Sequence, residues 1–218
     1  MIKFTKLAVI LCFAATALTA KAQVIYNSRA AFDLAHPINY VIDFNGYTPG
    51  PFQYASVTAP TPYGDVLFVS PQGNVEFLGN GNIPFLGAGN LALYAFNGQP
   101  FTDSLTITLS ANSFSFGTDV ISPSTTVPEP YQFTIFSGST VLAIVDSPSV
   151  SSAYTFIGYD SLTSPITSIK VQIANAVGSF EPTLDNFTVV PEPSTWLASG
   201  FALAAMVFVG RRRARIRG

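Results

Sequence analysis

The chain has 218 residues, of which 48% are hydrophobic and only 10% are charged, and its formal net charge at pH 7 is −2. This small value conceals an asymmetry, because eleven of the 12 acidic residues but only two of the 10 basic residues, Arg29 and Lys170, lie between positions 23 and 190. With a formal charge of −9, that region is too poor in cations to hold a phosphate backbone, which excludes nucleic acids as partners.

Cysteine and histidine are too scarce for several kinds of site. Cys12 is the only cysteine and lies in an apolar stretch near the N-terminus, so the rest of the chain has no thiol for a disulfide or a thiolate metal site. His36 is the only histidine, and one histidine is too few for the common zinc sites. We therefore expect a body held by its hydrophobic core, or by a metal ion bound through oxygen atoms.

Residues 1–22 have the layout of a secretory signal peptide. Lys3 and Lys6 precede the apolar stretch 7–18, and Ala20 and Ala22 form the small-x-small pattern at which signal peptidase cleaves. This pattern predicts export through the general secretion machinery and a mature chain that starts at position 23.

Two alternatives exist for this N-terminal segment. A retained anchor would have to span the membrane with the stretch 7–18, which is short for that purpose. Lipidation of Cys12 would require a small residue before it, and Leu11 is there instead.

One helix is predicted in the body, at residues 28–35. Ser28 can cap its N-terminus, and Pro37 prevents it from continuing. His36 at its end is expected to be a helix-terminal or surface residue and not a catalytic one, because no nucleophile-elbow sequence accompanies it for a Ser-His-Asp triad.

The remainder of the body has the period-two pattern of β-strands. In residues 104–109, Leu105, Ile107 and Leu109 alternate with Ser and Thr, as expected for antiparallel sheets with one face in solvent. Short strands separated by Gly and Pro predict an all-β antiparallel sandwich or jelly roll in one domain, 23–189. The predicted strands are 40–44, 53–58, 65–70, 74–78, 91–96, 104–109, 113–117, 131–136, 140–145, 153–159, 166–173 and 183–189.

Three tyrosines in a Pro/Gly-rich stretch are the candidates for glycan binding. Tyr47, Tyr54 and Tyr63 lie outside the predicted strand cores or at their ends, and sugar rings stack on exposed aromatic faces. The alternative is that they cover the edge of the core. The only tryptophan, Trp196, is near the C-terminus, which weakens a lectin-like function.

Acidic residues suggest two further kinds of site. Asp43 ends an early strand and Asp185 opens the last one; in many jelly rolls the chain ends are adjacent, so these carboxylates could share a structural calcium ion. A glycoside hydrolase would need two facing carboxyl groups, for which Glu76 and Glu181 are the candidates, although their spacing does not pair them. The alternative for all four residues is a solvated surface position.

The C-terminal segment 190–218 has the layout of a membrane-held tail. Pro191, Glu192 and Pro193 precede an uncharged segment, 194–210, which as a helix would be about 25 Å long, at the short end of what crosses a bilayer. The cluster that follows fixes the orientation, because basic flanks stay in the cytoplasm. Its members are Arg211, Arg212, Arg213, Arg215 and Arg217.

This order of Pro-Glu-Pro, hydrophobic helix and arginine-rich end resembles the PEP-CTERM sorting signal of Gram-negative bacteria. The resemblance implies recognition by an exosortase, removal of the tail, and release to the cell surface or the exopolysaccharide matrix. The alternative is an ordinary C-terminal anchor. Residues 127–130 repeat Val-Pro-Glu-Pro, but a strand-like segment follows that copy, so we expect it to be a loop.

The body also resembles the β-sandwich ectodomains that often carry this tail, through residues 41–44, 114–119, 156–159 and 184–189. The sequence therefore predicts an exported, non-catalytic protein of the cell surface or exopolysaccharide matrix, with exosortase as its partner and no cofactor unless calcium is bound. A glycan-binding module and a secreted glycoside hydrolase are the alternatives.

Overall fold

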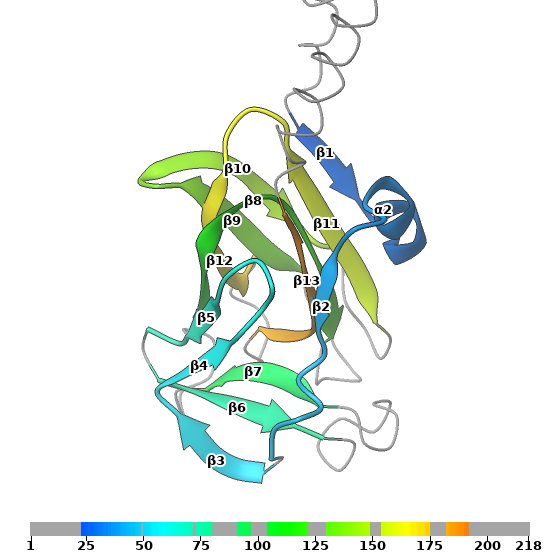
Figure 1. Ribbon diagram of the computed structural model, residues 1–218. Coiled ribbons are helices and arrows are strands. Elements are labelled where there is room, and N and C mark those ends of the chain that lie inside the picture. Colours follow the sequence, from blue (N-terminus) through cyan, green and yellow to red (C-terminus); the bar gives the residue numbers. More distant parts are fainter. Residues whose placement is uncertain are drawn as a thin grey trace, which may run out of the picture.

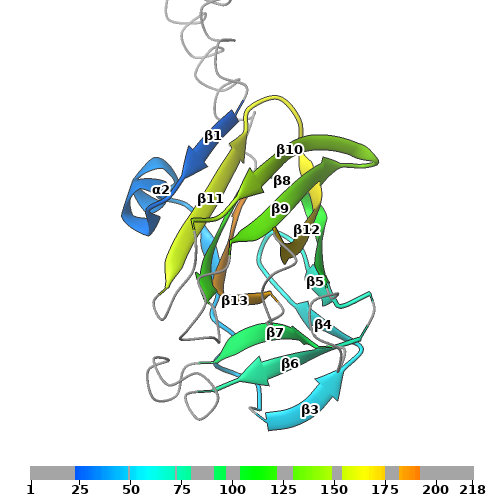
Figure 2. The same cartoon turned by 180° about the vertical axis from the view of Figure 1, so that it is seen from behind.

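The computed structural model describes residues 23–48, 50–71, 73–79, 91–96, 104–121, 130–148, 154–174 and 182–191. Thirteen strands, all paired antiparallel, and one short helix make up this part of the chain (Figures 1 and 2). The elements in chain order are β1 (Gln23–Tyr26), α2 (Arg29–Ala35), β2 (Tyr40–Ile42), β3 (Gly50–Tyr54), β4 (Ser56–Ala59), β5 (Val66–Val69), β6 (Asn74–Leu78), β7 (Ala92–Phe96), β8 (Ser104–Ile121), β9 (Tyr131–Ser137), β10 (Thr140–Asp146), β11 (Thr155–Ser161), β12 (Ile166–Ile173) and β13 (Thr183–Pro191).

The long strand β8 joins the two layers of the sandwich. Its first part pairs with β12 and β5, and its last part pairs with β11 and β13. One layer is therefore β10-β9-β12-β8-β5-β4, and the other is β1-β11-β8-β13-β7-β6-β3, with β2 beside the second half of β13. The predicted antiparallel sandwich is confirmed.

Aromatic side chains fill the space between the layers. Phe116 of β8 stacks on Phe133 of β9 with ring centroids 6.1 Å apart, and Phe187 of β13 meets Phe68 of β5 edge-on at 5.5 Å. All four rings are fully buried. The period-two pattern in the sequence thus placed the large apolar residues on the faces that meet.

The predicted elements differ from the observed ones in three places. The predicted strands 104–109 and 113–117 are one continuous strand of 18 residues, β8. The predicted strand 53–58 is two strands, β3 and β4, with Ala55 between them. The structure also adds β1, a strand of four residues that pairs with β11.

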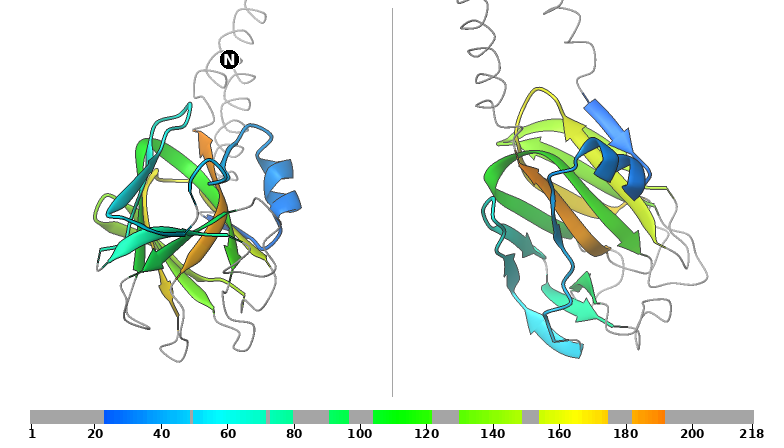
Figure 3. Two further views of the ribbon diagram at one scale, coloured as in Figure 1. Left: turned by 90° about the horizontal axis from the view of Figure 1, so that it is seen from below. Right: turned by 45° about the vertical axis from the view of Figure 1, so that its right-hand side comes forward.

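The predicted helix is confirmed, with Ser28 as its N-cap and His36 as its C-cap. It covers the outer face of the second layer beside β11 (Figure 3), where Phe32 is buried against Phe156 and Val190. Cross-strand partners Gly117 and Gly158 lie under these rings.

The terminal segments predicted from sequence lie outside the described residues. These are the signal peptide with Ala20 and Ala22, and the tail from Glu192 onward with its five arginines. Within the described part of the chain, no helix has the length and apolar character to span a bilayer.

Candidate functional sites around the last strand

The last strand of the body runs directly into the predicted sorting tail. Val189 and Val190 are 4% and 7% exposed; Val189 packs in the core between the layers, and Val190 packs under α2. The Ser113 hydroxyl donates a 2.6 Å hydrogen bond to the carbonyl oxygen of Val190, and Ser113 is paired in register with Pro191. The fold therefore extends to the first proline of the Pro-Glu-Pro sequence without a spacer.

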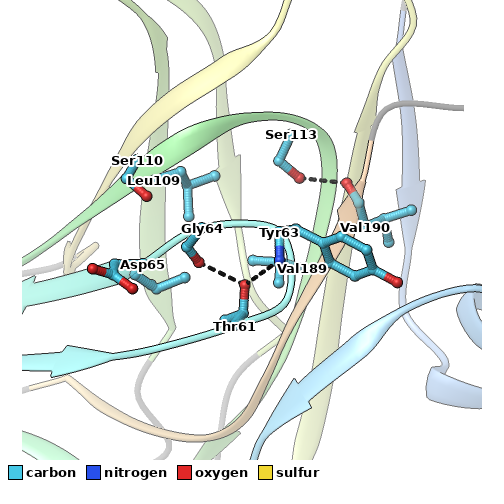
Figure 4. A pocket seen from close by; sticks show the side chains of 10 residues that line it. Thr61, Tyr63, Gly64, Asp65, Leu109, Ser110, Ser113, Val189 and Val190 are labelled. Atoms are coloured by element: carbon cyan, nitrogen blue, oxygen red, sulfur yellow. Dashed lines mark hydrogen bonds between the residues drawn. The ribbon is translucent and has the colours of Figure 1, made fainter. Parts of the chain in front are cut away.

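A shallow pocket lies beside this junction (Figure 4). The turn between β4 and β5, the bend of β8 and the end of β13 line it, among them Tyr63, Ser113 and Val190. The turn is held by Thr61, whose hydroxyl donates to the carbonyl of Gly64 at 2.6 Å and accepts from the Tyr63 N–H at 3.1 Å. The pocket has a volume of about 10 Å³, room for about one water molecule, which is far below the range of about 300–1,000 Å³ for small-molecule sites.

A cluster of acidic side chains lies at the opposite end of β13. The antiparallel pairing of β2 with β13 sets Ile42 opposite Phe187, so Asp43 comes near Asp185, as the sequence predicted. Asp185 is 3% exposed, and its carboxylate accepts a 2.7 Å hydrogen bond from the N–H of Asn186.

The environment of Asp185 favours its neutral form. Burial raises the pKa of Asp185 from 3.8 to about 7; the negative charges of Asp119 and Asp43 add to this, while the Asn186 N–H and Arg29 oppose it. Burial and the charges of Asp185 and Asp119 also raise the pKa of Tyr154 to about 12. Within the described residues, no group of three or more His, Cys, Asp and Glu side chains is arranged to hold a metal ion, so calcium at Asp43 and Asp185 stays a prediction.

Arg29 of α2 is the cation that balances this cluster. Its guanidinium is 2.9 Å from Asp119, donates to the carbonyl of Asn186 at 2.9 Å and to the Thr188 hydroxyl at 3.2 Å, and lies 4.8 Å from the ring centre of Phe156. Sequence reasoning missed Arg29 and Asp119. The sequence does contain an indication of this ion pair. Arg29 is one of only two cations in an acidic body, and such a rare cation is expected to form an ion pair with a carboxylate.

The three candidate glycan-binding tyrosines do not form one group. Tyr47 stacks on Phe77 at 4.3 Å, and Tyr54 meets the same ring edge-on at 5.7 Å. Tyr63 instead lines the pocket beside Val190. All three are half-buried against the core, which is the alternative that the sequence left open.

His36 is held by a carboxylate. Its Nε2 lies 2.8 Å from Asp160, and the Tyr26 hydroxyl donates to the other oxygen of Asp160 at 2.8 Å. The three side chains tie β1 and α2 to β11. His36 is at the end of the helix, as predicted, but its side chain is only 14% exposed and so is not a surface side chain. Asp160 was not predicted, because β11 is distant in sequence.

Only one of the two hydrolase candidates lies in the described part of the chain, so the structure does not test whether their carboxyl groups face each other. Glu76 lies on β6, where it is paired in register with Tyr94. Glu181 lies outside the described residues.

Solved structures similar to this chain are carbohydrate-binding modules, but the likeness is distant. A family 29 module from Piromyces equi is 10% identical and covers 69% of this chain and 88% of its own, with a TM-score of 0.38. A family 35 module from Clostridium thermocellum is 12% identical and covers 78% of this chain and 99% of its own, with a TM-score of 0.32. A search of curated protein sequences finds no match.

Sandwich and tail together define an exported β-sandwich protein with a C-terminal sorting signal. Residues 189–213 match the model of the PEP-CTERM protein-sorting motif. The chain therefore carries a PEP-CTERM sorting motif, and this motif indicates export, exosortase processing and sorting to the cell surface. The first three matched residues belong to β13.

Proposed function

We propose that this protein is a non-catalytic component of the cell surface or exopolysaccharide matrix, and that its acidic sandwich is the cargo delivered by the sorting tail. The observation that carries the proposal is the match to the sorting motif at residues 189–213, fused to a folded body. Removal of the tail would take away the five arginines and leave a body with a formal charge of −9, which favours solubility.

The described side chains support a body without catalysis. His36 is engaged by Asp160, and Glu76 on β6 is paired in register with Tyr94. The pocket at the end of β13 is smaller than a typical substrate site.

Intact-mass measurement of protein from the native host tests the proposal. We expect a chain that begins at Gln23 and ends between Pro191 and Pro193. A shorter end would remove Val189 and Val190, which are buried, and Arg217 retained in surface material would contradict processing.

The two Val-Pro-Glu-Pro copies provide a matched control for this measurement. Glu192→Gln is expected to leave the precursor in the inner membrane, if exosortase recognises that carboxylate. Glu129→Gln, in the other copy, should be processed as in the wild type. Equal processing of both variants would show that Glu192 is not recognised.

Glycan binding at Tyr47 and Tyr54 is a second candidate, because both rings flank Phe77 at one corner of the sandwich. We expect the exported protein to be retained on a polysaccharide column, and Tyr54→Ala to lose that retention. Tyr63→Ala, in the separate pocket, is the control. Lack of retention across a broad glycan panel would remove this candidate.

A further inference from the structure

The first strand of the body, β1, begins in the same row of the sheet in which the last strand, β13, ends. Gln23 pairs with Ser161 of β11, the preceding Asp160 pairs with Ser115 of β8, and Ser115 pairs with Val190 of β13. Three steps between neighbouring strands, each of about 4.8 Å, separate β1 from β13, so the two ends lie about 14 Å apart. Figure 3 shows both strands leading to one end of the sandwich.

Exposed apolar side chains surround this end. Tyr40, 37% exposed, is paired with Val189, and Ile38, 65% exposed, comes two residues before it. Leu162, 53% exposed, follows the residue that pairs with Gln23. We call Ile38, Tyr40 and Leu162 the apolar rim.

The segment between β13 and the predicted membrane helix is short, and its length determines which end of the body faces the membrane. Ser194, where the uncharged segment begins, comes only three positions after Pro191, and Trp196 comes only five positions after it. A fully extended chain spans at most about 3.6 Å per residue, so these distances are at most about 11 and 18 Å. A body tethered in this way keeps the end that carries β13 next to the lipid headgroups.

We propose that the apolar rim is a lipid-contacting surface, on which the precursor rests while the tail holds it in the membrane. The inference rests on the proposed function of the tail as an anchor. Ile and Leu side chains gain free energy by leaving water, and a Tyr ring suits the headgroup region. Asp65, an exposed carboxylate in the turn that lines the neighbouring pocket, keeps the contact at the interface and out of the hydrocarbon.

Site-directed fluorescence on the full-length chain, with Cys12→Ser as background, tests the rim. A single cysteine at Ile38 or Leu162 is labelled with an environment-sensitive dye, and the protein is reconstituted into phosphatidylethanolamine/phosphatidylglycerol nanodiscs. The control is a cysteine at Gln53, which is exposed on β3 at the end of the molecule away from β1 (Figure 1).

We expect labels at positions 38 and 162 to show blue-shifted emission and strong quenching by nitroxide lipids, and the label at 53 to be quenched mainly by aqueous iodide. If the membrane-bound protein shows the same emission and quenching at all three positions, the apolar rim does not contact lipid, although the tail can still act as an anchor. Labels at 38 and 162 that are shielded from both quenchers would show a protein contact there and also overturn it. Protein that does not associate with nanodiscs would overturn the anchoring role of the tail.

Discussion

Unfolding experiments from pH 5 to pH 8 are expected to show a loss of stability as the pH rises, because Asp185 is buried with a raised pKa. The pKa is about 7 in the folded state, against 3.8 as the ordinary value. Between these values the folded protein holds a proton that the unfolded chain releases, so raising the pH favours unfolding. The stabilisation is fully present below the unfolded pKa and is lost as the pH rises through the folded one.

The size of this effect has an upper bound. Each pH unit between the two pKa values is worth about 1.4 kcal/mol, which gives at most about 4 kcal/mol for this residue. Asp185→Asn removes the titration, so the variant should exceed the wild type in stability at pH 8 and approach it at pH 5. Denaturant unfolding at both pH values measures the difference.

Asp65→Asn, which removes one carboxylate at an exposed position, is the control. An Asp185→Asn variant that is equally destabilised at pH 5 and pH 8 would contradict the predicted cause.

The same variant tests calcium binding. An ion bound by Asp43 and Asp185 requires the ionised carboxylate, so added Ca²⁺ should stabilise the wild type at pH 8 and not the variant.

Replacing Phe32 by Ala is expected to cost about 3–5 kcal/mol of stability, as for other buried aromatic residues. Phe32 is fully buried and contacts three rings, with centroids 5.3 Å from Tyr26, 4.5 Å from His36 and 5.5 Å from Phe156. Its loss would separate α2 from the sheet and expose the surface beneath. Thermal and denaturant unfolding measure the cost.

Leu34 lies in the same helix and is 85% exposed, so Leu34→Ala should change stability by no more than about 0.5 kcal/mol. Gly158→Ala tests the contact from the other side, because its new Cβ would lie 2.6 Å from Cδ2 of Phe32. We expect that crowding to cost about 1–3 kcal/mol. Similar losses in Phe32→Ala and Leu34→Ala would show that α2 does not depend on this contact.

The elements that could be predicted from the sequence are those specified by neighbouring residues. Strand β12 has the predicted bounds, 166–173, because Ile169 and Val171 alternate with polar residues along one strand. The capped helix at Ser28 and the Pro-Glu-Pro tail are likewise local patterns. A processing enzyme recognises such a linear segment, so sorting can be inferred without knowledge of the fold.

The tertiary structure decided which distant side chains meet. The pairing of Asp119 with Arg29, the contact of His36 with Asp160, and the separation of Tyr63 from Tyr47 all depend on strand order and register. Strand β8 also continues across both layers, where the sequence predicted two strands. Periodicity shows which face of a strand is buried but not which strand lies beside it, because pairing is set by long-range packing. For the same reason, the sequence alone determined that the body is exported and acidic, and only the fold placed both of its ends at one rim.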